Sequence, residues 1–214
     1  MSLTLVIGNK RYSSWSLRPW LVAAHFGIPL AETLVPLDQP ETRAAILRHS
    51  PSGRVPCLVD GDVRVWESLA IIEYLAERFP EHPIWPRDVA ARALARAVSC
   101  EMHAGFADLR RACSMDLGRA PAPGPRNGEA AADVARIVGL WRDCHDRFGR
   151  GSPFLFGAFS AADAMYAPVA ARLVGYGFDL DADARAYVEA IHALPAMRRW
   201  IDEAAAEPWV LPEH

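Results

Sequence analysis

The hydrophobic pattern of this chain changes at one proline-rich segment, Pro-Glu-His-Pro-Ile-Trp-Pro at residues 80–86. Before it, short strand-like apolar runs alternate with helical patterns. Beyond it, no segment alternates with period two, and alanine-rich helical patterns dominate. Such a proline cluster breaks regular structure and predicts a domain boundary. We therefore expect an α+β domain over residues 1–79, a linker over 80–87 and an all-helical domain over 88–214.

The first domain predicts the element order β-α-β-α-β-β-α. Asp60-Gly61 between alternating apolar residues is a strong hairpin signal. Ser16 and Ser68 are the expected N-caps of the helices that follow them. A parallel β-α-β unit closed by an antiparallel hairpin is a thioredoxin-like arrangement, with helices on both faces of the sheet. The predicted strands are 3–7 and 32–36, the hairpin is 55–66, and the predicted helices are 17–26, 42–48 and 68–79.

The second domain predicts long helices over 89–117 and 129–148, separated by a Pro/Gly-rich loop at 118–128. Ser160 and Asp163 then have the spacing of a capping box, in which each side chain bonds the other residue's backbone N–H. We expect this box to start a buried helix and to serve folding rather than catalysis. Pro168 inside that helix should kink it.

Composition excludes several classes of function. A net charge of −3 argues against nucleic acid or an anionic membrane as the main partner. The four cysteines lie far apart, with no C-x-x-C and no paired histidine, so we expect neither a metal site nor disulfides. The apolar run at 3–7 is too short for a signal peptide. These features predict a cytoplasmic protein with free thiols.

Two neighbouring features predict a binding site for a small anionic peptide. If the Val55-Pro56 bond is cis, the Val55 backbone turns outward and can pair with an extended peptide. Glu67-Ser68 directly precedes a helical pattern. The hydroxyl and backbone N–H groups of a helix N-terminus suit a carboxylate ligand.

This ordered set, Val-Pro, hairpin and then acid–Ser at a helix start, resembles the glutathione-binding half of cytosolic glutathione transferases. In that family the proline is cis and the residue before it pairs with the cysteinyl backbone of glutathione. The acid–Ser pair holds the γ-glutamyl end. The resemblance implies these roles for Pro56, Val55, Glu67 and Ser68, and it implies glutathione as co-substrate and a homodimer. Arg54 is either a partner for a glutathione carboxylate or a surface arginine.

The loop after the first strand carries a second motif, Ser-Ser-Trp-Ser-Leu-Arg at residues 13–18. It resembles the Ser-Ser-Cys-Ser-aromatic-Arg motif of zeta-class transferases, which include maleylacetoacetate isomerases. There the first serine is thought to stabilise the glutathione thiolate, and it matches Ser13. Ser14 matches the second serine and Arg18 the arginine. Trp15 replaces the family's cysteine, and Tyr12 is a competing hydroxyl for which we expect a packing role.

Thiolate stabilisation needs only modest free energy. Lowering a thiol pKa from about 8.5 by about two units requires roughly 2.7 kcal/mol. One hydroxyl hydrogen bond to a charged sulfur contributes about 1.5–3 kcal/mol. The helix N-terminus and nearby cations would add to this. We expect Ser13 to be the stabiliser and Ser14 to be the alternative, with no metal.

The second substrate is less well specified. His103, Phe106 and Arg110 fall on one face of the predicted long helix. This face would line either an electrophile pocket or a solvated or dimer-facing side. We expect a glutathione transferase that adds glutathione to a small electrophile. The alternatives are a glutathione-dependent cis–trans isomerase of the maleylacetoacetate or maleylpyruvate type, and a non-catalytic binding or regulatory module.

Overall fold

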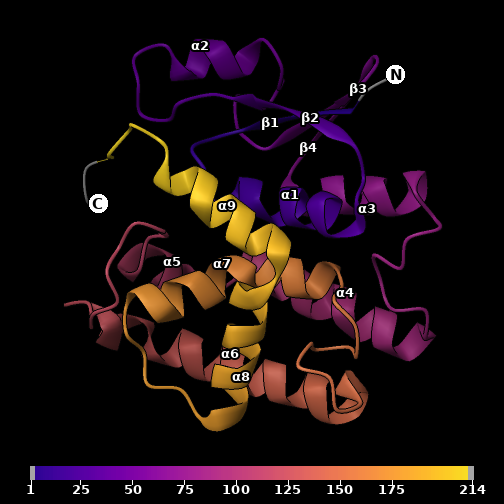
Figure 1. Ribbon diagram of the computed structural model, residues 1–214, viewed down its shortest axis with the longest axis vertical. Coiled ribbons are helices and arrows are strands. Elements are labelled where there is room, and N and C mark those ends of the chain that lie inside the picture. Colours follow the sequence, from indigo (N-terminus) through magenta and orange to yellow (C-terminus); the bar gives the residue numbers. More distant parts are fainter. Residues whose placement is uncertain (1–2, 212–214) are drawn as a thin grey trace.

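A four-stranded mixed sheet forms one end of the molecule in the computed structural model, which describes residues 3–211 (Figure 1). The strand order is β2-β1-β3-β4. Strand β1 pairs parallel with β2 and antiparallel with β3, and β3 pairs antiparallel with β4. This topology confirms the thioredoxin-like prediction. The strands are β1 (Leu3–Ile7), β2 (Leu30–Leu34), β3 (Cys57–Asp60) and β4 (Val63–Trp66).

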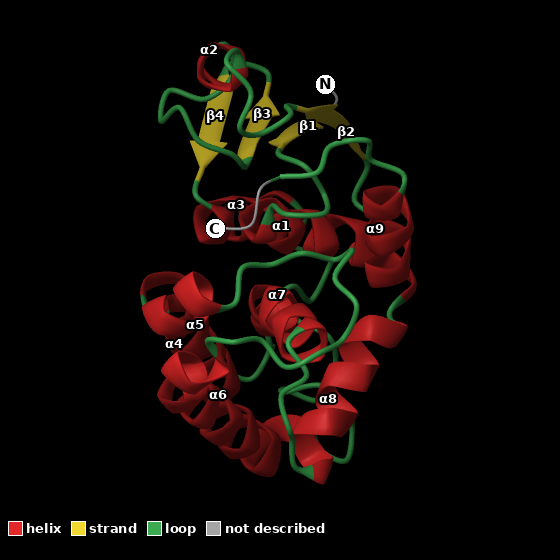
Figure 2. Cartoon of the chain, turned by 90° about the vertical axis from the view of Figure 1, so that its left-hand side faces the viewer, coloured by secondary structure: helices red, strands yellow, loops and turns green. Residues whose placement is uncertain are grey.

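Helices cover both faces of this sheet, as its alternating side chains require. Val6 and Cys57 point to one face, where Ile46 of α2 (Thr42–Leu47) packs against them. Leu5 and Leu58 belong to the larger core cluster on the opposite face. Figure 2 shows α1 (Ser14–Phe26) and α3 (Ser68–Arg78) on the side of the sheet that faces the rest of the molecule.

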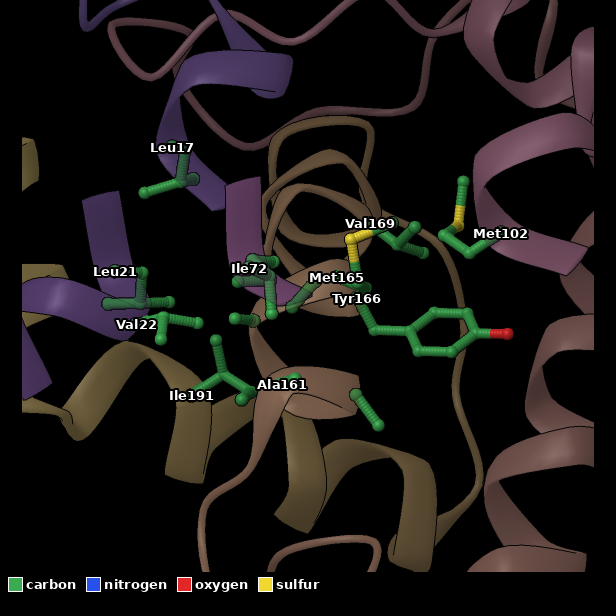
Figure 3. Packing of buried hydrophobic residues seen from close by; sticks show 14 of the residues in the cluster. Leu17, Leu21, Val22, Ile72, Met102, Ala161, Met165, Tyr166, Val169 and Ile191 are labelled. Atoms are coloured by element: carbon green, nitrogen blue, oxygen red, sulfur yellow. The ribbon is translucent and has the colours of Figure 1, made fainter. Parts of the chain in front are cut away.

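The second half of the chain contains only helices among its described residues. Helix α7 runs through the middle of this half (Figure 2), and every residue in it except Val174 is buried. Its side chains meet those of α1, so that Leu21, Val22, Met165 and Val169 share one apolar core (Figure 3). The helices are α4 (Val89–Ala104), α5 (Ala107–Ala112), α6 (Ala131–Cys144), α7 (Ala161–Gly175), α8 (Ala182–Ala193) and α9 (Pro195–Ala205), with a 3₁₀ turn at Asn127–Ala130 and a π turn at His145–Gly149.

Both predicted N-caps in the first half are wrong by one to three residues. Helix α1 begins at Ser14, and its cap is Ser13, whose Oγ accepts a hydrogen bond from the Ser16 N–H at 3.3 Å. Ser16 instead lies inside the helix, where its Oγ accepts from the Gly8 N–H at 3.1 Å. Ser68 is the first residue of α3, and Glu67 occupies the cap position.

The predicted helix over 89–117 is wrong, because it is broken into α4 and α5 at Gly105 and Phe106. A Cβ atom on Gly105 would lie 2.8 Å from the Glu101 carbonyl oxygen, so the close approach there needs glycine. Phe106 follows with a φ of 57°, a left-handed conformation that ends the helix. The second strand begins and ends two residues earlier than predicted.

The capping box of α7 is confirmed. The Asp163 carboxylate accepts from the Ser160 N–H at 2.8 Å and from the Leu155 N–H at 3.2 Å, and both box contacts are present. Pro168 lies within the continuous helix. Among residues 3–211, no helix combines the length and the apolar character needed to cross a membrane.

Candidate active site

A cleft of about 610 Å³ lies at the N-terminus of α1, between the sheet and the helical half. Ser13, Ser14 and Trp15 lie on its α1 side, and Arg54 and Val55 come from the turn before β3. Arg110 of α5 and Arg172 of α7 close it from the helical half. The cleft therefore combines the two predicted serines with groups from both halves of the chain.

The hydroxyl of Ser13 is committed to the helix. It caps α1 by accepting from the Ser16 N–H, and it donates to the Ser16 Oγ at 2.7 Å. The side chain is 5% exposed. One hydroxyl has a single proton to donate, and that of Ser13 is used within the protein.

Ser14 has different partners. Its Oγ accepts a hydrogen bond from Nη2 of Arg172 at 3.3 Å. A guanidinium group has donors only, so this bond leaves the Ser14 proton free for another acceptor. Among the described residues, no other hydrogen bond involves the Ser14 hydroxyl. Ser14 therefore has a proton to offer to a ligand in the cleft.

Three guanidinium groups surround Trp15 and Ser14. Arg18 lies 4.0 Å from the Trp15 ring centroid and Arg110 lies 5.6 Å from it. Burial and the neighbouring Arg172 hold the pKa of Arg18 well below its usual value. Burial and Arg110 lower the pKa of Arg172 to about 10, so it remains charged at neutral pH.

These guanidinium groups find neutral acceptors rather than carboxylates. Arg18 donates from Nε to the Met165 carbonyl, and its two Nη atoms are buried with no partner among the described residues. Arg110 donates to the carbonyls of Met102 and His103. Arg18 is fully buried and is not part of the cleft lining, so its predicted contact with glutathione is not evident in the geometry.

A second pocket of about 300 Å³ adjoins the cleft, and Trp15, Arg54 and Val55 line both. It also contains the remaining predicted binding residues Pro56, Glu67 and Ser68. The Val55-Pro56 peptide bond is cis, as the resemblance implied. Glu67 has a φ of 70°, which is uncommon for a residue other than glycine and marks a functional candidate. The Ser68 Oγ is buried and lacks a hydrogen-bond partner among the described residues.

His103 belongs to this smaller pocket and not to the cleft. Its Nε2 lies 3.4 Å from Oε2 of Glu67, and its ring packs edge-on against Trp15. Burial lowers the pKa of His103, opposed by Glu67. Phe106 is 7% exposed and packs into the core. The predicted common face of His103, Phe106 and Arg110 is therefore wrong, because the break between α4 and α5 separates them.

The loop that carries the serines is held from the other end of the chain. Lys10 is 6% exposed and forms ion pairs with Glu32 and Glu203. The Glu207 carboxylate accepts from the backbone N–H groups of Lys10 at 2.7 Å and Arg11 at 3.3 Å.

Tyr12 also contacts the end of the chain, because its hydroxyl accepts from the Leu211 N–H at 3.2 Å. Helix α9 and the residues after it thus fix the position of the β1–α1 loop.

Arg172 and Glu207 were not among the site residues predicted from the sequence. Arg172 did carry a signal, since it is a charged residue in an otherwise apolar helical segment. Charged groups of this kind are seldom fully buried unless they are paired or functional. Glu207 carried no such signal, because its partners are backbone groups far away in the sequence.

Family models match most of the chain. The model of the glutathione S-transferase N-terminal domain matches residues 12–78, and that of the C-terminal domain matches residues 126–203. Curated relatives match shorter parts. A "Glutathione S-transferase 1" of Dianthus caryophyllus is 54% identical over 48 residues, 22% of each chain.

A "Probable maleylacetoacetate isomerase" of Caenorhabditis elegans is 38% identical over 98 residues, 45% of each chain. The chain thus spans less than half the length of these relatives.

Solved structures share the whole fold. A glutathione transferase homologue from Burkholderia, solved with bound glutathione, aligns over 97% of this chain and 100% of its own with a TM-score of 0.74 and 23% identity. A glutathione S-transferase of the clam Laternula elliptica aligns over 97% and 95%, with a TM-score of 0.74 and 22% identity. The two domain models together cover more than half of the sequence, and the chain therefore belongs to the glutathione S-transferase family.

Proposed function

We propose that this protein is a glutathione transferase that binds reduced glutathione, stabilises its thiolate and adds it to a small electrophile. The observation that carries this proposal is the Ser14 hydroxyl, which has a free proton at a helix N-terminus beside a cation-lined cleft. The adjoining pocket supplies the groups that the resemblance assigns to glutathione. The related Burkholderia protein was solved with glutathione bound, which agrees with this proposal.

The two connected pockets suit the two parts of glutathione. The γ-glutamyl end would enter the 300 Å³ pocket, where Glu67 is available for its ammonium group and the buried Ser68 hydroxyl for its carboxylate. The cysteinyl backbone would pair with Val55 at the junction of the pockets. The sulfur would then extend toward Ser14, and Arg54 would lie near the remaining carboxylate.

The hydrogen bonds of the two serines favour Ser14 over Ser13 as the thiolate stabiliser. Ser13 donates its proton to Ser16 and caps α1, whereas Ser14 accepts from Arg172 and donates to no group within residues 3–211. A hydrogen bond to an anion contributes about 1.5–3 kcal/mol, which is enough to lower a thiol pKa by one to two units. We therefore place Ser14 first and assign Ser13 to the helix cap.

The reaction then needs no nucleophile from the protein itself. The bound thiolate attacks the electrophilic carbon, an S–C bond forms, and the leaving group departs with its electron pair. With a Michael acceptor, a solvent proton completes the addition. Catalysis would consist of pKa lowering and proximity.

A glutathione-dependent cis–trans isomerase is the second candidate, favoured by the nematode relative's name and by the double-serine motif. Reversible addition of the thiolate would convert the double bond into a single bond that can rotate before glutathione leaves. Assays with maleylacetoacetate, maleylpyruvate and an aryl halide separate isomerisation from conjugation. A protein that binds glutathione but turns over none of these substrates would support the non-catalytic alternative.

We also propose a cytoplasmic homodimer. Strand β4 is at the edge of the sheet and leaves Val63 and Trp66 exposed, at 47% and 43%. A neighbouring groove between α3 and α4 is lined by Leu69, Ala70 and Cys100, together with charged and polar side chains. A second copy would cover these apolar groups. Sedimentation at micromolar concentration tests this proposal, and a 23.5 kDa species would contradict it.

Isothermal titration of glutathione into the purified protein tests the proposed function. We expect saturable binding, weakened about tenfold or more by Glu67→Gln, because the ligand ammonium group loses a charged partner. Glu73→Gln is the matched control, since Glu73 lies on α3, the helix that Glu67 precedes, but pairs with Arg96. Absence of binding at millimolar glutathione would contradict the proposal.

A further inference from the structure

Arg172 is fixed from three directions inside the protein. Its Nε donates to the Cys113 carbonyl at 2.8 Å, after the end of α5. Its Nη1 donates to the Pro168 carbonyl of its own helix at 3.2 Å, and its Nη2 donates to Ser14 Oγ. The residue is only 5% exposed, yet it lines the cleft. These three hydrogen bonds fix the orientation of the guanidinium, with Nη2 directed at Ser14.

The hydrogen bond from Arg172 determines the direction in which the Ser14 hydroxyl can donate its proton. Because the guanidinium occupies an acceptor site of Ser14 Oγ, the hydroxyl proton must point elsewhere. Within residues 3–211 no protein group takes that proton, and Ser14 lines the cleft. The arginine thus turns a rotatable hydroxyl into a directed donor.

The charge of Arg172 lacks a counter-ion in the part of the chain that the structure describes. The groups that face it are Arg18 of α1, Arg110 of α5, the Cys113 thiol and the Tyr176 hydroxyl. Neither arginine can neutralise it. Cys113 is itself buried, and its pKa is raised by that burial. A bound anion beside Ser14 would be the counter-ion.

A purely structural role explains this arrangement poorly. A buried guanidinium without a carboxylate costs free energy, and an apolar side chain of similar length would fill the same volume more favourably. The unpaired charge is easier to understand if the ligand neutralises it.

We propose that Arg172 is a positioning residue, whose guanidinium orients the Ser14 hydroxyl toward the glutathione sulfur and supplies positive charge behind it. This inference rests on the proposed function. It makes α7, in the helical half, part of the thiolate site, whereas the family's serine motif lies entirely in the first half.

The test is ultraviolet titration of the thiolate of bound glutathione in Ser14→Ala, Arg172→Met and the double variant. As a general rule, at an effective dielectric constant near 20, a unit charge about 6 Å from a thiol changes its pKa by about one to two units. Arg172→Met should raise the bound thiol pKa by about 1 or more. Because the two residues act together, the double variant should raise it by less than the sum of the single variants. Arg172→Lys keeps the charge but loses the several N–H donors of the guanidinium. Its bound thiol pKa should therefore lie between those of the wild-type protein and Arg172→Met.

Arg119→Gln is the control, because Arg119 lines the same cleft but donates to the Gly175 carbonyl, whereas Arg172 donates to Ser14. We expect a smaller change in thiol pKa there, since Arg119 is only half-buried and solvent screens part of its charge. Thermal unfolding of each variant shows whether it is folded. If Arg172→Met does not fold, the bound thiol pKa values of Arg172→Lys and Ser14→Ala still test the role of Arg172.

An unchanged bound thiol pKa in folded Arg172→Met overturns the inference, as does strict additivity in the double variant. An unchanged value in Ser14→Ala overturns it too. In each case a lowered pKa in the wild-type protein would leave the proposed function intact. Wild-type protein that binds no glutathione, or binds it with an unshifted thiol, would overturn the proposed function and this inference with it.

Discussion

The loop that carries the serines lies between two groups of cations that are neutralised differently. In the first group, formed by Lys10 and Arg11, the charges are paired with carboxylates. Lys10 contacts Glu32 and Glu203, and Arg11 forms a two-bond pair with Asp116 at 2.5 and 3.0 Å. These pairs join segments that are distant in the sequence, and they fix the loop in place.

Beside α7, the charges form no ion pair with a carboxylate of residues 3–211. Arg18, Arg110 and Arg172 donate to carbonyl groups and to one hydroxyl. Neutral acceptors bond some of these N–H groups but do not neutralise the charge. We infer from this difference that the paired cations hold the loop in position, whereas the unpaired cations supply the positive charge that the proposed anionic ligand requires.

The largest expected effect comes from removing the donor on the unpaired side. We expect Ser14→Ala to lower kcat/KM by about 10- to 100-fold at neutral pH, because losing one hydrogen bond to the thiolate costs about 1.5–3 kcal/mol. Ser13→Ala is the matched variant. It removes the α1 cap and should lower the free energy of unfolding by about 0.5–2 kcal/mol while changing the thiol pKa less. Steady-state kinetics and denaturant unfolding would show this exchange of roles. A larger kinetic loss in Ser13→Ala would reverse the assignment.

The pH dependence of glutathione binding tests the effect of the unpaired cations without a mutation. If the unpaired charges favour the thiolate, glutathione affinity should rise by up to about tenfold per pH unit between the bound and the free thiol pKa. S-methylglutathione cannot ionise at sulfur, so its affinity should change much less over that range. Isothermal titration between pH 6 and 9 measures both ligands. If the affinities of glutathione and S-methylglutathione change in parallel with pH, the cleft does not bind the thiolate more tightly than the neutral thiol.

Asp163, a buried acidic group at the other end of α7, allows a test of how burial affects a group of the opposite charge. Burial raises its pKa to about 6, despite hydrogen bonds from Leu155 and Ser160. Between about pH 4 and 6 the folded state then holds the proton more tightly than the unfolded state. The contribution of Asp163 to stability is therefore greatest at low pH and falls as pH rises through this window.

Asp163→Asn supplies the non-titrating reference. The unfolding free energy of the wild-type protein minus that of the variant should be larger at pH 4 than at pH 7, by about 1–3 kcal/mol. Denaturant unfolding at several pH values measures this difference. A difference that grows with pH would contradict the raised pKa.

The smallest expected effect comes from the paired side. Glu207→Ala removes the acceptor of two loop N–H groups, and we expect the free energy of unfolding to fall by about 1 kcal/mol. Turnover should fall a few-fold because the loop is less well held, while the bound thiol pKa stays near the wild-type value. Asp202→Ala, at an exposed position on α9, is the control. A large rise in the bound thiol pKa in Glu207→Ala would contradict the view that the paired groups only position the loop, because they would then also stabilise the thiolate.

Features encoded by a few adjacent residues could be predicted from the sequence. Asp60-Gly61 specified the hairpin, and Ser160 with Asp163 specified the start of α7. Each signal acts within three or four residues, so no knowledge of the tertiary structure was needed. The pairing of Val55-Pro56 with Glu67-Ser68 in one pocket followed from the same short-range pattern and the family resemblance.

Features that depend on distant contacts could not be predicted. Ser13, Ser14 and Ser16 are all competent caps, and the Gly8 N–H that engages Ser16 helps decide between them. The break at Gly105 interrupts an otherwise good helical pattern. The Ser14–Arg172 contact spans 158 residues and becomes visible only when α7 packs on α1.

The pKa of the thiol of glutathione bound to the wild-type protein, read from thiolate absorbance between pH 5 and 9, tests the proposed thiolate site most directly. We expect a value well below the ordinary thiol value of about 8.5, because the Ser14 donor and the unpaired charges favour the anion. Glutathione bound with an unshifted thiol would contradict it.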